Sequence, residues 1–129
     1  MSDPSPNAER LRMNPPATTD QLARAEIALG TLLPDELVRL YRAANGQYSV
    51  HGHWWVVWPL SNLMEADAWL RPVDGYLVEW IPFGDDGTGD PYCFHRTSQW
   101  ITRLSMTDLA HERVAAGLPD FWTMVLSRV

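Results

Sequence analysis

The chain has 129 residues, of which 46% are hydrophobic and 20% are charged, and this length and composition fit one globular domain. Sixteen acidic and ten basic residues give a net charge of −6, and every basic residue is arginine. Such a chain lacks the dense basic face that binds nucleic acid directly, so its charge favours a basic protein partner instead. Seven tryptophans predict an aromatic-rich core or aromatic side chains reserved for a partner.

The cysteine content and the hydrophobic pattern predict a cytoplasmic protein. Cys93 is the single cysteine, so no disulfide can form within the chain, and a reducing compartment is expected. The polar, proline-rich start does not have the pattern of a signal peptide. Residues 46–64 contain no Asp, Glu, Lys or Arg, but their apolar centre, 54–60, is too short to span a membrane.

The first third of the chain predicts an arm followed by two short helices. Residues 1–16 are expected to form a flexible N-terminal arm, and residues 17–129 one domain. Thr18 and Gln21 have the spacing of a capping box, and Gly30 occupies the position of a helix C-cap. Pro34 then begins a second helix, which Asn45-Gly46 ends.

The rest of the chain alternates strand-like and helical patterns. Residues 48–58 are rich in strand-forming residues, and His51-Gly52-His53 is expected to divide them into two strands. The further predicted elements are a helix over 62–70 capped by Ser61, strands over 76–83, 91–94 and 100–104, and a helix from Pro119-Asp120 to Leu126. This order predicts an α+β fold in which helices pack mainly on one face of an antiparallel sheet.

The sequence GDDGTGD, residues 84–90, has three carboxylates and three glycines, which raises the question of a ligand loop. A calcium loop starting at Asp86 would need glycine at its sixth position and a bidentate acid at its twelfth, where Pro91 and Thr97 stand. A phosphate loop would need a third glycine or a lysine and a following helix. The pattern therefore favours a hairpin turn, with Gly87 and Gly89 where a tight turn needs glycine.

Two pairs of zinc-type ligands leave a metal site open. His51 and His53 form one pair with a single intervening residue, and Cys93 and His95 form another. Such pairs point to one face of a strand, so adjacent strands would bring four ligands together. The alternative is a surface histidine pair and a cysteine packed as a small hydrophobic residue.

No catalytic constellation is predicted. Cys93 lies between two aromatic residues, where burial favours an inert thiol, and no serine lies in a nucleophile-elbow motif. The run WWVVW, residues 54–58, is apolar on both faces of a strand, which is typical of a central strand. Alternatively, the face of Trp55 lines a protein-binding surface, since tryptophan is enriched at binding hot spots.

Several of these features, in their order, resemble the SUKH (SMI/KNR) superfamily over about residues 15–126. The resemblance rests on these residues: Glu26, Gly30, Leu33-Pro34, Asn45-Gly46, Trp58-Pro59-Leu60, Phe83, Asp86-Gly87, Gly89-Asp90 and Phe121. The chain departs from the pattern at Phe94-His95, where an aliphatic residue and Asp are common. Residues 105–120 match it loosely.

The resemblance implies an α+β fold without enzymatic activity and without a cofactor. Bacterial members look like immunity proteins that bind and block a cognate toxin, often a nuclease or deaminase, of polymorphic toxin systems. Fungal relatives act as scaffolds, so a cytoplasmic scaffold or regulatory module with no toxin partner is the alternative function. The residues expected to contact a partner are Trp54, Trp55, Glu65, Asp85, Asp86 and Asp90.

Overall fold

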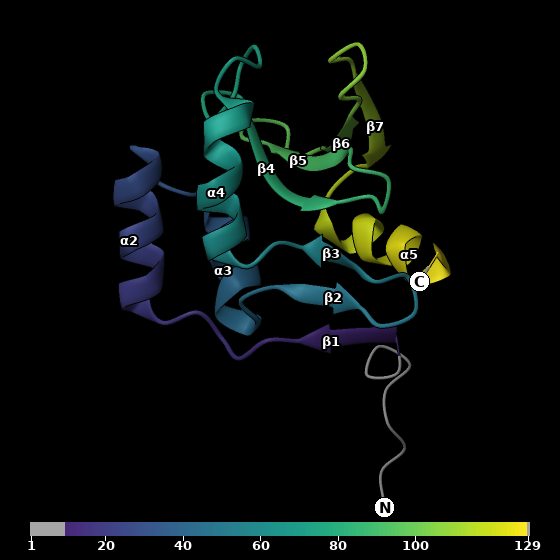
Figure 1. Cartoon of the computed structure of the whole chain (residues 1–129), viewed down its shortest axis with the longest axis horizontal. Helices are drawn as coiled ribbons and strands as arrows, with labels where there is room; N and C mark the ends of the chain where they lie inside the picture. Colours follow the sequence, from purple (N-terminus) through teal and green to yellow (C-terminus); the bar gives the residue numbers. More distant parts are fainter. Residues whose placement is uncertain (1–9, 129) are drawn as a thin grey trace, which may run out of the picture.

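The computed structural model describes residues 10–128, which form four helices and two antiparallel sheets (Figure 1). The helices are α2 (Thr19–Leu29), α3 (Asp35–Ala43), α4 (Leu60–Leu70) and α5 (Leu118–Arg128). The strands are β1 (Leu11–Met13), β2 (Gln47–Ser49), β3 (Trp54–Val57), β4 (Trp80–Asp85), β5 (Pro91–His95), β6 (Ile101–Leu104) and β7 (His111–Ala115). The predicted α+β class is confirmed. None of these helices is both long and apolar enough to cross a membrane.

The two sheets have the strand orders β1-β2-β3 and β4-β5-β6-β7, and they meet where β3 passes β4. There the backbone N–H of Trp58 donates to the carbonyl of Phe83 at 2.8 Å. Gly84 makes this approach possible, because a Cβ atom at this position would lie 1.8 Å from the carbonyl oxygen of Val56. Val56 and Val57 are fully buried. The prediction of a central strand is nevertheless wrong for the sheet order, because β3 is the last strand of its three-stranded sheet and is covered by the adjacent β4.

The helix boundaries follow the capping residues, with one exception. Thr18 and Gln21 form the predicted capping box, and Gly30 ends α2 in the left-handed conformation. Helix α4 begins at Leu60, so the prediction that Ser61 caps a helix starting at residue 62 is wrong. The Oδ1 atom of Asn45 instead accepts a hydrogen bond from the N–H of Leu60 at 2.9 Å. A residue distant in sequence therefore replaces the local cap.

The N-terminal residues within the structure belong to the domain. Strand β1 pairs with β2, Leu11 is buried, and Arg10 donates a hydrogen bond to the carbonyl of Leu126 in α5. The prediction of a flexible arm through residue 16 is therefore wrong for residues 10–16. Residues 1–9 lie outside the described residues. The strand was missed because three residues are too few to show an alternating pattern.

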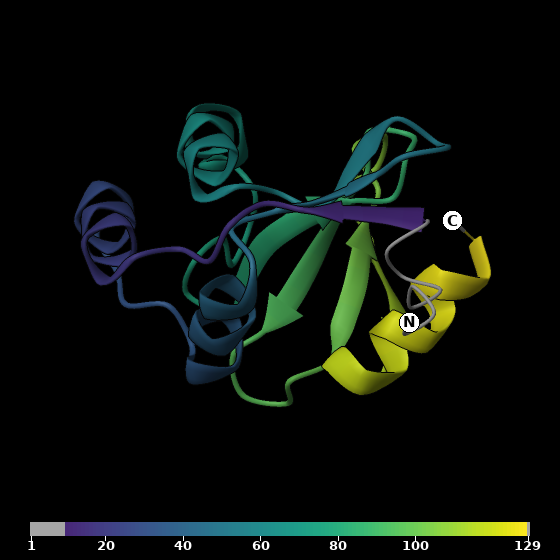
Figure 2. The same cartoon turned by 90° about the horizontal axis from the view of Figure 1, so that it is seen from below.

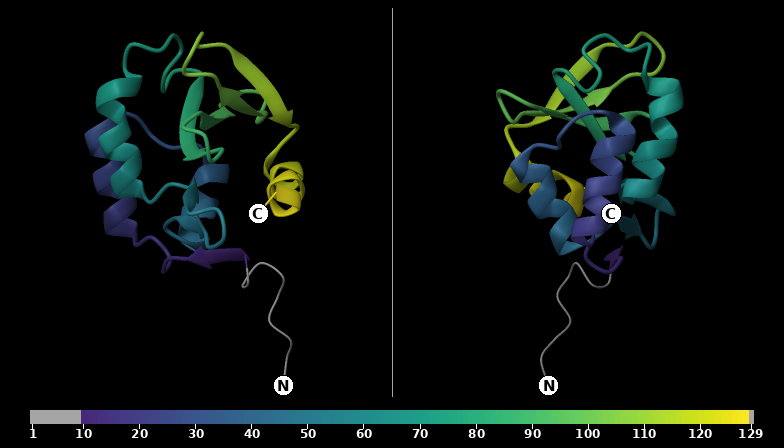
Figure 3. Two further views of the ribbon diagram at one scale, coloured as in Figure 1. Left: turned by 45° about the vertical axis from the view of Figure 1, so that its right-hand side comes forward. Right: turned by 90° about the vertical axis from the view of Figure 1, so that its left-hand side faces the viewer.

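Helices contact both faces of the four-stranded sheet, where the sequence predicts that they lie mainly on one. On one face, the ring of Phe121 in α5 packs against Phe83 and Tyr92, with centroid distances of 5.3 and 4.9 Å. Cys93 follows Tyr92 in β5 and faces the other side, near Leu70 of α4. Helices α2 and α4 lie side by side at one edge of the molecule, and α5 lies at the other (Figures 2 and 3).

Three hairpin loops share one backbone design. In each, a residue with positive φ donates its N–H to the carbonyl four residues earlier; these residues are His53, Gln99 and Leu109, with φ of 61°, 65° and 61°. The first residue of each loop also accepts a backbone hydrogen bond through its side chain, and these residues are Ser49, His95 and Ser105. The predicted division of residues 48–58 at His51-Gly52-His53 is the first of these loops.

Strand β7 at the edge of the four-stranded sheet was not predicted. Its sequence, HERVA, carries two charged residues and is mostly exposed or half-buried. An edge strand tolerates such polar residues because it pairs on one side only. The alternation of apolar and polar residues that identifies an inner strand is therefore weak here.

Candidate functional site

Residues of α4, of the β3–α4 connection and of the end of β4 with the following turn line a groove of about 320 Å³, called here the acidic groove. It is lined by Trp58, Asn62, Glu65, Ala66, Trp69, Asp85 and Gly89. Two of the residues predicted to bind a partner, Glu65 and Asp85, are therefore brought together from distant parts of the chain.

Helix α4 supplies one wall of the acidic groove through its outer face. Asn62, Glu65 and Trp69 recur at helical spacing and are at least partly exposed, whereas Leu63 and Leu70 point into the core with essentially no exposed surface. The same periodicity that buries the apolar side of α4 thus presents a carboxylate and an indole to solvent.

Two tryptophans give the groove an aromatic surface. The side chain of Trp69 is 48% exposed, whereas Trp58 is almost completely buried, and their rings make an edge contact with centroids 6.3 Å apart. The buried ring supports the exposed one, so Trp69 is presented in a defined orientation. Aromatic side chains held in this way lose little conformational entropy on binding.

Asp85 closes the groove at the end of β4. Its Oδ1 atom accepts hydrogen bonds from the N–H groups of Gly87 and Gly89 at 2.6 and 3.3 Å. Burial raises the pKa of the Asp85 carboxyl, and the two hydrogen bonds act in the opposite direction. A cationic group in the groove would offset the cost of burying this charge, because an opposite charge favours the ionised form.

The other two carboxylates of the turn have structural roles. Asp86 is 2% exposed, and its Oδ1 atom accepts hydrogen bonds from the N–H and hydroxyl of Thr88 at 2.8 and 2.7 Å. Its Oδ2 atom lies 3.6 Å from Nη1 of Arg103. Asp90 accepts a hydrogen bond from the N–H of Met106 at 3.0 Å. Asp86 and Asp90, both expected to contact a partner, are therefore engaged within the fold, and Asp86 is buried.

The two glycines of the turn have the backbone conformation that the sequence predicts. Gly87 and Gly89 have φ of +95° and +99°, which residues with a side chain rarely adopt. A Cβ atom on Gly87 would also approach the ring of Trp54 to 3.2 Å.

Trp54 and Trp55 do not line the acidic groove. The ring of Trp54 covers Gly52 and Gly87, and the ring of Trp55 makes an edge contact with Tyr48 across the strand pair at 5.0 Å. The tryptophans at the groove, Trp58 and Trp69, are not among the residues that the sequence predicts to contact a partner. For Trp69 a signal was available, because it lies four residues after Glu65 and outside the apolar stripe of α4.

The four residues considered for zinc do not converge. Within residues 10–128, no group of three or more His, Cys, Asp or Glu side chains is placed to hold a metal ion. His51 and His53 lie in the exposed β2–β3 loop, and His95 packs against Trp80. Cys93 is buried, and burial raises the pKa of its thiol, so it stays protonated at neutral pH.

Comparison with known proteins identifies a related family. The model of the SMI1 / KNR4 family (SUKH-1) matches residues 16–112. A search of curated proteins found no match to the chain. The matched region contains every residue that lines the acidic groove.

Proposed function

Because the chain belongs to the SMI1 / KNR4 family (SUKH-1), a family of non-catalytic protein-interaction domains, we propose that it is a non-enzymatic protein-binding domain. More specifically, we propose that it is an immunity protein, which neutralises a cognate nuclease-like or deaminase-like toxin of a bacterial polymorphic toxin system. The protein would act in the cytoplasm and would need no cofactor.

The acidic groove is the observation that supports this proposal. Trp69 offers an exposed aromatic ring, and Glu65 and Asp85 place two carboxylates beside it. Exposed tryptophan next to complementary charge is the composition of binding hot spots, where a few residues provide most of the affinity. The net charge of −6 would also speed the encounter with a basic partner.

Inhibition would follow from charge mimicry. A toxin that acts on nucleic acid holds phosphates with arginine and lysine side chains. Glu65 and Asp85 would pair with these arginine and lysine side chains in place of the substrate phosphates. Trp69 would pack against the rim of the toxin's cleft and exclude substrate. No chemical step by this chain is required, because occupation of the cleft is sufficient.

Co-expression tests the proposal directly. An immunity gene is expected directly downstream of a large gene whose last segment encodes a small, basic toxin domain. That segment, expressed alone, is expected to stop growth, whereas co-expression with this chain restores growth and the two proteins co-purify. A segment that remains lethal in the presence of the chain would contradict the immunity function. A non-toxic partner that co-purifies would favour a scaffold.

A matched pair of variants tests the groove within that experiment. Trp69→Ala is expected to weaken toxin binding by about 30-fold or more, as loss of a hot-spot side chain typically costs at least 2 kcal/mol. Trp100→Ala is the control, because Trp100 is exposed to a similar extent, 44%, and lies outside the groove. Equal affinities of the two variants in titration calorimetry would show that the toxin contacts another surface.

A further inference from the structure

A second pocket, with no residue in common with the acidic groove, lies at the end of the molecule where both α2 and α4 terminate (Figure 1). It has a volume of about 440 Å³ and is lined by residues 29–31, Arg71, residues 76–78 and Arg96. We call it the Arg96 pocket. The proposed function does not use it.

The guanidinium of Arg96 is held in a fixed orientation and keeps an unused donor. Its Nε atom donates a hydrogen bond to the carbonyl of Leu77 at 2.7 Å, and its Nη2 atom donates one to the hydroxyl of Thr31 at 3.0 Å. The Nη1 atom donates no hydrogen bond within residues 10–128, and it is not among the buried polar atoms that lack a partner there. A ligand in the pocket can therefore accept a hydrogen bond from Nη1 without displacing the existing ones.

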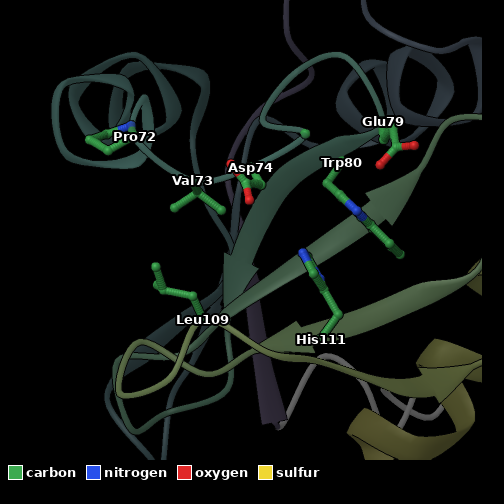
Figure 4. A pocket seen from close by; sticks show the side chains of 8 residues that line it. Pro72, Val73, Asp74, Glu79, Trp80, Leu109 and His111 are labelled. Atoms are coloured by element: carbon green, nitrogen blue, oxygen red, sulfur yellow. The ribbon is translucent and has the colours of Figure 1, made fainter.

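No carboxylate compensates the charge of Arg96 within the part of the chain that the structure describes. Arg96 forms no ion pair there, whereas the other cation of the pocket, Arg71, pairs with Asp67 at 2.7 Å. The carbonyl of Glu79 accepts a hydrogen bond from the N–H of Arg96 at 2.8 Å, but Glu79 lines a separate hollow, which Figure 4 shows. Burial lowers the pKa of Arg96, yet an arginine side chain stays charged at neutral pH. The pocket therefore contains an uncompensated, half-buried positive charge.

Exposed aliphatic side chains surround the Arg96 pocket. Val78 belongs to its lining, and Ile27 and Leu32 line an adjoining hollow of about 480 Å³. The two hollows share Gly30 and Thr31, so they form one continuous surface. Val78, Ile27 and Leu32 are 78%, 81% and 73% exposed, more than any other large hydrophobic residue within residues 10–128. Single exposed apolar residues are common, but a group of them beside a pocket marks a binding surface.

We propose that this surface binds a protein segment in which a carboxylate side chain is flanked by apolar side chains. The carboxylate accepts a hydrogen bond from Nη1 of Arg96, and the apolar side chains cover Ile27, Leu32 and Val78. Charge complementarity selects this occupant, because a half-buried cation without a counterion is costly and favours an anionic partner. The aliphatic residues extend beyond the reach of a small anion, and the net charge of −6 disfavours the anionic surface of a membrane.

A phage-displayed library of random short peptides tests the proposal on the intact protein. Counter-selection on the double variant Ile27→Ser, Leu32→Ser removes peptides that bind elsewhere, including basic peptides at the acidic groove. Both positions are exposed, so the double variant is expected to fold normally. The remaining peptides are expected to contain Asp or Glu between apolar residues. Enrichment of basic or uncharged peptides, or of none, would overturn the proposal.

A selected peptide and its analogue, with the acid replaced by the amide, measure the contact with Arg96. The analogue is expected to bind about tenfold more weakly to the intact protein and as well as the parent peptide to Arg96→Gln. Comparison of the two peptides within one variant cancels the effect of losing the hydrogen bonds to Leu77 and Thr31. Arg71→Gln is the control, because Asp67 already neutralises Arg71, and the tenfold difference is expected to remain. A difference that persists in Arg96→Gln would contradict the assignment.

A further pair of variants tests the aliphatic residues with Arg96 intact. Ile27→Ser is expected to weaken binding of the selected peptide about fivefold. Met13→Ser also removes an exposed apolar side chain, but outside this surface, and is expected to leave the affinity unchanged. Equal affinities of the two variants would overturn the proposal.

Vesicles that contain phosphatidylserine distinguish a protein partner from a membrane. The intact protein is expected not to bind them, and binding that is lost in Ile27→Ser would overturn the proposal in favour of a membrane. Toxin neutralisation is a separate readout at the acidic groove, so its failure would count against the proposed function alone.

Discussion

Gly84 is a position at which the fold tolerates little change, because a Cβ atom there would meet backbone. Its φ is not positive, so the requirement for glycine arises from the close passage of β3 over β4 rather than from backbone conformation. The atom that a side chain would meet is a backbone oxygen of Val56, which cannot move without shifting the strand. The sequence pattern predicts structural roles for Gly87 and Gly89 but not for Gly84, because a tertiary contact leaves no local pattern.

Gly84→Ala is therefore expected to lower the free energy of unfolding by more than about 3 kcal/mol, through a clash with backbone. Gly89→Ala is the matched control, because open space surrounds Gly89 and the cost there is only the positive φ, about 1 kcal/mol. Urea unfolding of both variants measures the difference. A Gly84 variant as stable as the Gly89 variant would show that the strands are not this close.

Asp85→Asn separates binding from stability at the acidic groove. Asparagine keeps an oxygen that can accept the hydrogen bonds from Gly87 and Gly89 and removes the charge whose burial raises the pKa. We expect unchanged or slightly higher stability at pH 7 and about tenfold weaker binding to a basic partner. Thermal unfolding and titration calorimetry measure the two effects. A stability loss above about 1 kcal/mol would indicate that the charge itself holds the turn.

At the scale of elements, the β4–β5 turn is fastened to two other elements through its backbone and side chains. Arg128 of α5 donates a hydrogen bond to the carbonyl of Asp86 at 3.0 Å, and Arg103 of β6 lies beside the Asp86 carboxylate. The turn is therefore part of the core architecture, although its composition resembles a ligand loop.

Asp86→Ala is expected to destabilise the protein by about 2–4 kcal/mol, because it leaves the N–H and hydroxyl of Thr88 without their acceptor and Arg103 without one of its two carboxylates. Asp120→Ala, at the first turn of α5, is the control and is expected to cost less than about 1 kcal/mol. Chemical denaturation checks both values. A near-neutral Asp86→Ala would contradict the structural role assigned here.

Most elements were predictable from sequence because their signals are local. Capping residues and helical periodicity located α2 and α3, and glycine-containing breaks located the β2–β3 and β4–β5 hairpins. The short edge strand β1 and the polar edge strand β7 lack such signals. At the acidic groove, Glu65 and Asp85 were foreseen as partner-binding residues, but their proximity was not, since it depends on how α4 packs beside β4. The burial of Asp86 was not foreseen, because the composition of a charged turn does not show which of its carboxylates is buried.

For the molecule as a whole, His111 makes stability dependent on pH. Burial lowers the pKa of His111 in the folded protein, with the nearby Glu79 acting in the opposite direction and His95 adding to the decrease. The unfolded chain therefore binds a proton more readily than the folded one. The stabilisation is present above the pKa of an unfolded histidine, about 6.5, and is lost as the pH falls below it.

We expect the free energy of unfolding to fall between pH 7 and pH 5, and to fall less steeply in His111→Gln. The contribution is a fraction of the maximum of about 1.4 kcal/mol per pH unit, because the ring is partly solvated. Urea unfolding of both proteins at several pH values isolates His111, since all other titratable groups are common to them. Parallel pH profiles would contradict the role of His111.

The recurrence of one loop design in three hairpins has a consequence for how this protein can change. A side-chain acceptor at the first position and a positive φ at the last define the backbone path. In the β6–β7 loop, the exposed side chain of Thr107 lies between these two positions and takes no part in that geometry. Substitutions there can accumulate without altering strand register. The tip of this loop is thus a place where the surface can diverge while the scaffold stays constant.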